Sequence, residues 1–306
     1  DDYALFMALR TRYDGAWTDW PEPIQRRDPD ALGSHREELS ATVRYHEFVQ
    51  FVFDRQWRAL RDYAADRGID LVGDLPIYVA LDSADVWANP GVFDLTPHNE
   101  PAAVAGVPPN PGDDGQRWGN PVYDWDRLRS TGYAWWLDRL DRLLDLVDVA
   151  RIDHFKGFDE YWAIPADADD PAAGEWRDAP GHDFFETVER ELGELPFVVE
   201  DLGFLDQGLV DLRERFGWRG DPAEPLAALR LVDRAVAGRL ERRRLVAQHR
   251  PDRRPDQPAF QLILVVPVLD ERGCGVRVAP VPHCHVDADG RPVGGRGGGD
   301  RRSRQL

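Results

Sequence analysis

The chain contains very little cysteine, methionine or lysine. Its 306 residues include two cysteines, one methionine and a single lysine, Lys156. Two cysteines cannot form the disulfide framework of a small secreted domain, so we expect reduced thiols and a cytoplasmic protein. The sequence also lacks any run of 18 apolar residues, and its first residues resemble no signal peptide. It therefore predicts a globular, soluble protein without a membrane anchor.

Acidic residues outnumber basic ones. The chain has 56 acidic and 38 basic residues, which gives a net charge of -18. Such a balance repels nucleic acid and anionic lipid, so we expect neither as a partner. Nearly all of the basic residues are arginine and aspartate is abundant, a composition typical of a salt-adapted cytosol. Oligomeric state has no signature in the sequence.

Aromatic residues almost disappear after Trp218. Of 32 Phe, Trp and Tyr residues, only Phe260 lies beyond that point, and the net charge changes from -23 in residues 1–219 to +5 in residues 220–306. The two parts differ too much to be one domain. We expect residues 1–219 to be the folded part and residues 220–306 to be a disordered or out-of-frame tail. A reading-frame shift near Gly220 explains the change better than a flexible basic extension does.

Residues 1–219 alternate between helical and strand-like patterns. Helices are predicted over 40–67, 132–146 and 184–192, and strands over 69–79, 146–150 and 196–199. In the first helix, Ser40 is a candidate cap, and Val43, Phe48, Phe51, Val52, Trp57 and Leu60 form an apolar stripe. Alternation of this kind predicts an α/β fold with a parallel sheet and right-handed crossovers.

Each predicted strand ends in an acid-bearing motif. Asp74 lies in Gly-Asp-Leu-Pro, Asp153 in Arg-Ile-Asp-His-Phe, and Glu200 in Glu-Asp-Leu-Gly. Arg151 precedes Asp153 by two residues, so along a strand both side chains share a face, and the guanidinium would keep the carboxylate ionised. Acids at the carboxyl ends of neighbouring strands suggest glycoside chemistry. Asp74 has an alternative role as a cap or a salt-bridge partner of Arg151, and Asp201 is expected to be structural.

These motifs resemble those of the amylomaltase, or disproportionating enzyme, family of 4-alpha-glucanotransferases. The resemblance rests on GDLPIYVALDSADVW (73–87), GQRWGNPVYDW (115–125), RIDHFKGF (151–158) and EDLG (200–203), and it extends from Asp1 to about Gly220. It implies a partial (β/α)8 barrel of the TIM type, comprising the middle strands. Residues 81–125 would be an inserted substrate-binding segment, in which Trp87 and Trp118 offer flat faces to sugar rings. Because Asp1 resembles an internal family position, we expect the chain to be an internal fragment.

The resemblance also implies a reaction and its residues. The family moves alpha-1,4-glucan segments between maltodextrins by a retaining double displacement and releases glucose, without a cofactor. By resemblance, Asp153 is the nucleophile and Glu200 the acid/base. The implied substrate-binding residues are Asp74, Gln116, Trp118, Arg151 and His154. No metal is expected, because the Cys and His residues near 283–285 do not have the spacing of a zinc site.

Two departures from the family pattern affect the expected activity. Pro108-Pro109-Asn110 replaces a Pro-Pro-Asp segment, and no His-Asp-Asn motif, which carries the third catalytic acid of the family, follows Gly203. We therefore expect this chain by itself to be nearly inactive. Two other functions stay open: an alpha-amylase-like hydrolase, which would pass the sugar to water, and a catalytically silent fragment that binds glucan.

The charge of residues 1–219 predicts that salt stabilises the protein. A net charge of -23 over this length is self-repulsive, and salt screens such repulsion. In a protein with the reading frame restored, the melting temperature should rise between low salt and molar salt. Thermal melts followed by circular dichroism would measure this, and a melting temperature that stays constant or falls would contradict salt adaptation.

Overall fold

The structure is a computed structural model that describes residues 2–193, 195–200 and 206–220, with residues 219 and 220 described by their backbone alone. The predicted tail after Gly220 lies outside these residues. The helical elements are α1 Asp2–Arg12, η1 Trp17–Asp19, α2 Glu22–Gln25, α3 Pro29–Glu38, α4 Ser40–Ala65, α5 Ala84–Ala88, η2 Pro90–Val92, α6 Trp125–Ser130, α7 Ala134–Leu146, η3 Phe155–Phe158, η4 Pro171–Ala173, α8 Gly181–Leu192 and α9 Gln207–Arg215. The strands are β1 Val72–Leu75, β2 Ala103–Val107, β3 Gln116–Pro121, β4 Val149–Ile152, β5 Glu160–Pro165, β6 Glu175–Asp178, β7 Phe197–Val199 and β8 Arg219–Gly220.

Strands β1, β4, β7 and β8 form a parallel sheet in that order. The predicted alternation of helix and strand and the α/β class are confirmed. The first strand is shorter than the predicted range of 69–79, because it ends before Pro76, which has no N–H to donate to a ladder. The carbonyl oxygens of Pro76 and Ile77 instead accept hydrogen bonds from Arg139 of α7, at 2.7 and 3.2 Å.

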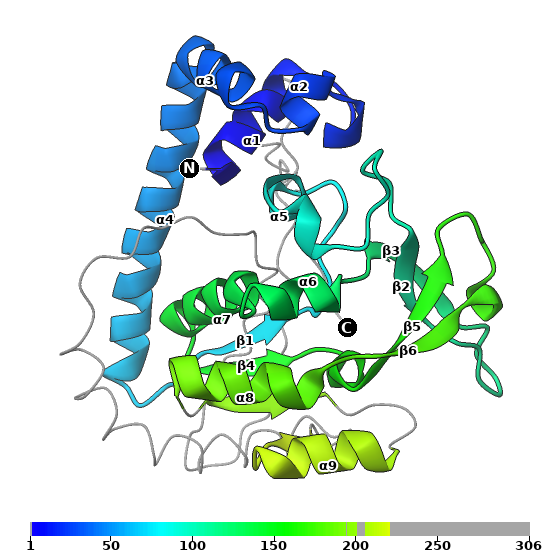
Figure 1. Cartoon of the computed structure of the whole chain (residues 1–306). Coiled ribbons are helices and arrows are strands. Elements are labelled where there is room, and N and C mark those ends of the chain that lie inside the picture. Colours follow the sequence, from blue (N-terminus) through cyan, green and yellow to red (C-terminus); the bar gives the residue numbers. More distant parts are fainter. Residues whose placement is uncertain (1, 194, 201–205, 221–306) are drawn as a thin grey trace, which may run out of the picture. The chain divides into compact units, whose positions relative to one another are not determined.

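A second sheet, antiparallel, has the order β3-β2-β5-β6. Two of its strands lie between β1 and α7 in the chain, and the other two lie between β4 and α8, so both excursions from the parallel sheet meet in one sheet (Figure 1). Residues 81–125 thus include regular structure. The expectation that Trp87 offers a face to sugar is wrong: its side chain is fully buried, and its ring lies 5.8 Å from Phe6.

Helix α7 packs against β1 and β4, as its predicted apolar face requires. Trp136, Leu140 and Leu143 are all buried on that face. The helix approaches β1 closely at Gly73, where an added Cβ would lie 3.3 Å from Leu143 of α7 and 2.8 Å from a methyl group of Val147, the residue after the helix. Figure 1 shows α7 and α8 in front of the strands β1 and β4.

The long helix α4 is fastened to the end of α7 by two side chains. Trp57 donates its indole N–H to the carbonyl oxygen of Leu146 at 2.7 Å. Arg61 donates to the carbonyl oxygens of Leu144 and Val147 and forms a 2.9 Å ion pair with Asp148. Carbonyl groups at the end of a helix lack partners within the helix, so these two side chains satisfy groups that α7 leaves open.

The predicted apolar stripe of α4 is buried only in part. Val43 and Trp57 are buried, whereas Phe48, Phe51 and Leu60 are 62%, 61% and 45% exposed. Ser40 is not a cap either: it is the first helical residue, because the chain turns from α3 into α4 through Leu39 alone. Apolar periodicity identified the helix, but tertiary contacts with α1, α3 and α7 selected the side that is covered.

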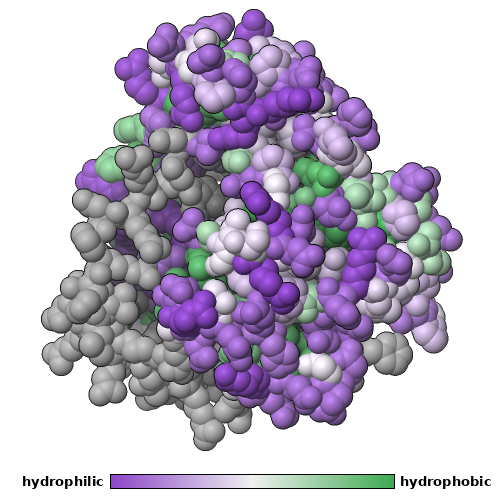
Figure 2. Space-filling model, in the orientation of Figure 1, coloured by the Kyte–Doolittle hydropathy of each residue, from purple (hydrophilic) through white to green (hydrophobic). Residues whose placement is uncertain are grey.

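Hydrophilic residues cover most of the face shown in Figure 2, and hydrophobic residues appear there in small separate patches. Within the ranges that the structure describes, no helix combines the length and the apolar composition needed to span a bilayer.

Gly181 provides a test of the packing between α8 and its neighbours. An added Cβ would lie 2.3 Å from the carbonyl oxygen of Phe158 in η3 and 2.8 Å from Leu212 of α9. Gly181→Ala should therefore lower the free energy of unfolding by about 1–3 kcal/mol, because backbone has to move.

Gly33→Ala is the matched control, since a Cβ there meets nothing within 4 Å in the interior of α3. That substitution should raise the free energy of unfolding by up to about 1 kcal/mol through helix propensity. Urea denaturation of both variants measures the difference, and equal effects would contradict the described packing at Gly181.

Candidate active site

The register of the parallel sheet brings four charged side chains together at the carboxyl ends of its strands. Asp74 of β1 pairs with Arg151 of β4, and Ile152 pairs with Val199 of β7. Asp153 and Glu200 each follow that last pair directly, so they lie at the same level. Because alternate residues of a strand share a face, Arg151 and Asp153 project together.

Arg151 binds all three acids. One terminal nitrogen of its guanidinium lies 2.7 Å from Asp74 and 3.0 Å from Asp153, and the other lies 2.7 Å from Glu200. Burial lowers the pKa of Arg151, but the hydrogen bond and charge of Asp74, with those of the other two carboxylates, outweigh burial and raise it. The guanidinium of Arg151 therefore stays positively charged and holds the three carboxylates close together.

The surroundings of Glu200 shift its pKa in both directions. Burial raises its pKa, and so does neighbouring Asp153, whereas the backbone N–H of His154 and the charge of Arg151 lower it. The net effect is a pKa above the usual value. The His154 N–H donates to the Glu200 carboxylate at 2.8 Å, and the Phe155 N–H donates to the Glu200 carbonyl oxygen at 3.3 Å. A carboxyl group in these surroundings can both give and take a proton.

His154 lies in a left-handed backbone conformation with φ 50° and ψ 52°. This conformation is uncommon outside glycine and occurs most often where function or tight turns demand it. Here it ends strand β4 and turns the His154 N–H toward Glu200. The imidazole ring contacts Trp118 edge to face, with ring centroids 4.9 Å apart. Trp118 in turn donates its indole N–H to Gln116 at 2.9 Å.

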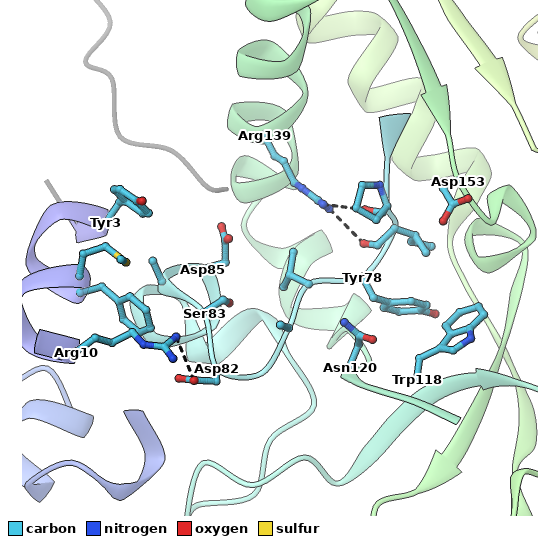
Figure 3. Close-up of a pocket in the computed structure, with 17 residues that line it drawn as sticks. Tyr3, Arg10, Tyr78, Asp82, Ser83, Asp85, Trp118, Asn120, Arg139 and Asp153 are labelled. Carbon is cyan, nitrogen blue, oxygen red and sulfur yellow. Dashed lines mark hydrogen bonds and ion pairs between the residues drawn. The ribbon is translucent and has the colours of Figure 1, made fainter. Parts of the chain in front are cut away.

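A cavity of about 740 Å³ opens beside the charged cluster. Asp153 and Trp118 line one end of it, and Tyr3 and Arg10 of α1 line the other (Figure 3). Tyr78 forms part of the wall, with its ring 6.2 Å from that of Trp118. The cavity is large enough for a chain of sugar rings, since ligand sites usually measure several hundred Å³.

Another acid in the cavity wall, Asp85, is nearly fully buried. Burial raises its pKa to about 6, although the charge of Arg139 lowers it. Arg139 itself is occupied with the backbone of Pro76 and Ile77, as Figure 3 shows.

All seven side chains named from the sequence as site residues belong to this cluster or are linked to it through contacts. Asp74, Arg151, Asp153 and Glu200 meet directly, and His154, Trp118 and Gln116 form a connected series beside them. Asp74 does pair with Arg151, which was its alternative role. Asp201 and the remainder of its motif lie outside the described residues. Tyr78 was missed as a site residue, although it stands within the first quoted motif.

The site shows no arrangement for a metal ion. Among residues 2–193, 195–200 and 206–220, no group of three or more His, Cys, Asp or Glu side chains is placed to hold one. Arg151 occupies the space between the three acids, where a cation would otherwise bind. The Cys and His residues near 283–285 fall outside the described part of the chain.

The family model and the known proteins that this chain resembles carry the same name. The sequence model of glycoside hydrolase family 77, described as 4-alpha-glucanotransferase, matches residues 1–221. The 4-alpha-glucanotransferase of Streptococcus pneumoniae is 46% identical over 221 residues, which cover 71% of this chain and 44% of that protein. The Thermus thermophilus 4-alpha-glucanotransferase is 45% identical over 222 residues, which cover 72% of this chain and 44% of that protein.

A solved structure of an amylomaltase has a similar fold. The amylomaltase from Streptococcus agalactiae in complex with acarbose superposes with a TM-score of 0.69 at 41% identity, covering 72% of this chain and 45% of that one. The chain thus spans less than half the length of these relatives.

The environment of His154 predicts a pH dependence of stability. Burial lowers its pKa from 6.5 to about 4, with Asp153 raising it and Lys156 lowering it. Between these values the unfolded chain binds a proton that the folded chain does not, so the free energy of unfolding should fall as pH drops from 6.5 toward 4.

His154→Gln, which cannot titrate, should lose less stability over the same interval. Urea denaturation of both proteins at the two ends of this pH range gives the comparison, and equal losses would show that His154 is not the group responsible.

Proposed function

We propose a reaction for this protein that starts from its family. The chain belongs to glycoside hydrolase family 77, and its relatives in that family are named 4-alpha-glucanotransferases. The proposed reaction moves an alpha-1,4-glucan segment from a donor maltodextrin to an acceptor maltodextrin or glucose. The observation that carries the proposal is the binding of Asp74, Asp153 and Glu200 by the one guanidinium of Arg151.

In the first step, the Asp153 carboxylate attacks the anomeric carbon of the donor. The glycosidic bond breaks as Glu200 gives its proton to the leaving oxygen, and the sugar becomes an ester of Asp153. A retaining enzyme needs its two carboxyl groups only about 5–5.5 Å apart. Ion pairs from Asp153 and Glu200 to the two ends of one guanidinium support so short a separation.

In the second step, an acceptor hydroxyl group attacks the same carbon. Glu200, now ionised, takes the hydroxyl proton, and the ester to Asp153 breaks. The opposing effects on the pKa of Glu200 suit a group that serves first as acid and then as base. Arg151 compensates the charge of the cluster at each stage.

The remaining site residues have proposed roles in binding. Asp74 accepts hydrogen bonds from sugar hydroxyl groups, and His154 donates to them. Trp118 packs on a sugar ring with its exposed face, since 37% of the residue is open to solvent beside the cavity. Gln116 holds the Trp118 indole in place and can contact the same sugar.

Transfer is favoured over hydrolysis by the aromatic wall of the site. Trp118 packs against both Tyr78 and His154 and lines the cavity with Asp153, so an acceptor sugar can stack on this wall and displace water from the ester. Incubation with maltotriose separates the two reactions, because transfer gives glucose and longer maltodextrins, whereas hydrolysis gives only shorter sugars.

The architecture proposed for this reaction is a (β/α)8 barrel, of which β1, β4, β7 and β8 are middle strands. The parallel order and the acids at the carboxyl ends of the strands support it. Residues 1–219 would be the catalytic part, with the segment 81–125 inserted. The family match ends at residue 221, and the composition changes after Trp218. Both observations support the proposal that residues 220–306 do not belong to the catalytic part.

The assignment of Asp153 can be tested by its half-reaction. A maltosyl fluoride donor needs no acid for its leaving group, so the full chain should slowly form a covalent adduct on Asp153. Mass spectrometry of the intact chain and of its peptides detects that adduct. Glu200→Gln should retain the adduct, and Asp153→Asn should lose it, at a cost on the order of 10³-fold in rate.

Asp145→Asn is the matched control, because Asp145 lies at the end of α7 away from the cluster. It should label like the unaltered chain. An adduct on another residue, or equal labelling of Asp153→Asn, would rule out Asp153 as the nucleophile.

A further inference from the structure

Lys156, the only lysine among 38 basic residues, is buried in η3, directly after the turn at His154. Its ammonium group donates a 2.7 Å hydrogen bond to Glu160 and a second, short one to Asp206. The same nitrogen lies 5.0 Å from the ring centre of Trp176. The Lys156 side chain is 8% exposed, whereas the side chains of Glu160 and Asp206 are 31% and 41% exposed.

The surroundings of Lys156 are strongly acidic. Asp159 also belongs to the cluster, where burial and the charge of Asp206 raise its pKa. Burial lowers the pKa of Lys156, but hydrogen bonds to Asp206 and Glu160 outweigh burial and raise it. The ammonium group is thus firmly charged, and its removal would leave three carboxyl groups facing one another.

The contacts of Lys156 join three separate elements. Glu160 is the first residue of β5, and Asp206 caps α9 by accepting a hydrogen bond from the Leu209 N–H at 2.9 Å. Lys156 itself is continuous with β4 through His154 and Asp153. One side chain therefore fixes η3 against the antiparallel sheet on one side and against α9 on the other.

The turn fixed in this way is the one that contacts Glu200. His154 N–H donates to the Glu200 carboxylate, and Phe155 N–H donates to its backbone carbonyl. Within the turn, Gly157 N–H donates to His154 oxygen at 3.0 Å and Asp159 N–H donates to Lys156 oxygen at 2.9 Å. His154 holds an uncommon left-handed conformation, which persists only if its surroundings fix it.

We propose that Lys156 is a positioning residue: its ion pairs with Glu160 and Asp206 hold the left-handed turn at His154, so that the His154 N–H stays on the Glu200 carboxylate. The catalytic meaning of this contact rests on the acid/base role proposed above for Glu200. The contact itself does not depend on that role, and it can be measured without turnover.

The experiment compares Lys156→Met, Lys156→Arg and the unaltered 306-residue chain. Met keeps much of the length and loses the charge, whereas Arg can still donate to both acids. Arg190→Met is the matched control, because it removes a base whose ion pair with Glu191 is exposed on α8. Circular dichroism first establishes which variants fold.

Two measurements follow on the folded proteins. Hydrogen exchange by mass spectrometry reports the amides of His154 and Phe155 separately from those of α9. Carbon-13 NMR of labelled glutamate, with the signal assigned through Glu200→Gln, reports the pKa of Glu200. The charged groups that face Glu200 in the described residues, Arg151 and Asp153, are the same in every variant.

Lys156→Met should exchange the His154 and Phe155 amides roughly tenfold faster, because the turn opens more often. The pKa of Glu200 should rise, since the His154 N–H contact lowers it. Lys156→Arg should restore both values, and Arg190→Met should change neither.

Faster exchange confined to α9, with the His154 amide and the Glu200 pKa unchanged, would overturn the proposal and leave Lys156 as an anchor of α9 alone. If Lys156→Met does not fold, the decision rests on Lys156→Arg: normal exchange and pKa support the proposal, and a loosened turn despite the retained charge contradicts it. Failure of Asp153 to form an adduct would count against the proposed reaction and leave these two readouts intact.

Discussion

The contact on which the site depends is the binding of three carboxylates by the guanidinium of Arg151. Asp74, Asp153 and Glu200 come from three strands, and without a cation their negative charges would repel one another at short distance. Arginine suits this place because its planar group offers five donors and keeps its charge under all ordinary conditions. Strands β1, β4 and β7 must be in the observed register for one side chain to reach all three acids.

Arginine plays a related part in the scaffold that supports this edge. Arg139 satisfies the carbonyl groups where β1 ends, and Arg61 satisfies those where α7 ends. Both side chains replace backbone partners at points where an element stops, so the elements can end abruptly without leaving buried acceptors open. The single ammonium group of the chain is used differently: Lys156 places a compact charge between two acids and the face of an indole ring.

The antiparallel sheet contributes aromatic and polar side chains that contact the residues after β4. Strand β3 brings Trp118 to His154, with Gln116 bonded to the Trp118 indole, and β5 and β6 bring Glu160 and Trp176 to Lys156. The cluster of charges therefore comes from the ends of the parallel strands, Trp118 comes from the antiparallel sheet, and the two meet at His154. In the proposed reaction, Asp153 and Glu200 of the cluster perform the chemistry, while Asp74, His154 and Trp118 hold the sugar.

Apolar periodicity and strand-end motifs are local properties, so they were enough to predict the α/β class, the main helices and the acids at the ends of the strands. The common face of Arg151 and Asp153 also follows from their spacing of two. The sequence could not determine that Trp87 is core while Trp118 reaches the cavity, because the two tryptophans stand in similar segments and differ only in what packs on them. Nor could it show which side of α4 is covered, or that Lys156 meets Asp206 fifty residues away. Those features depend on which elements come together in space, and local sequence patterns carry no information about such distant contacts.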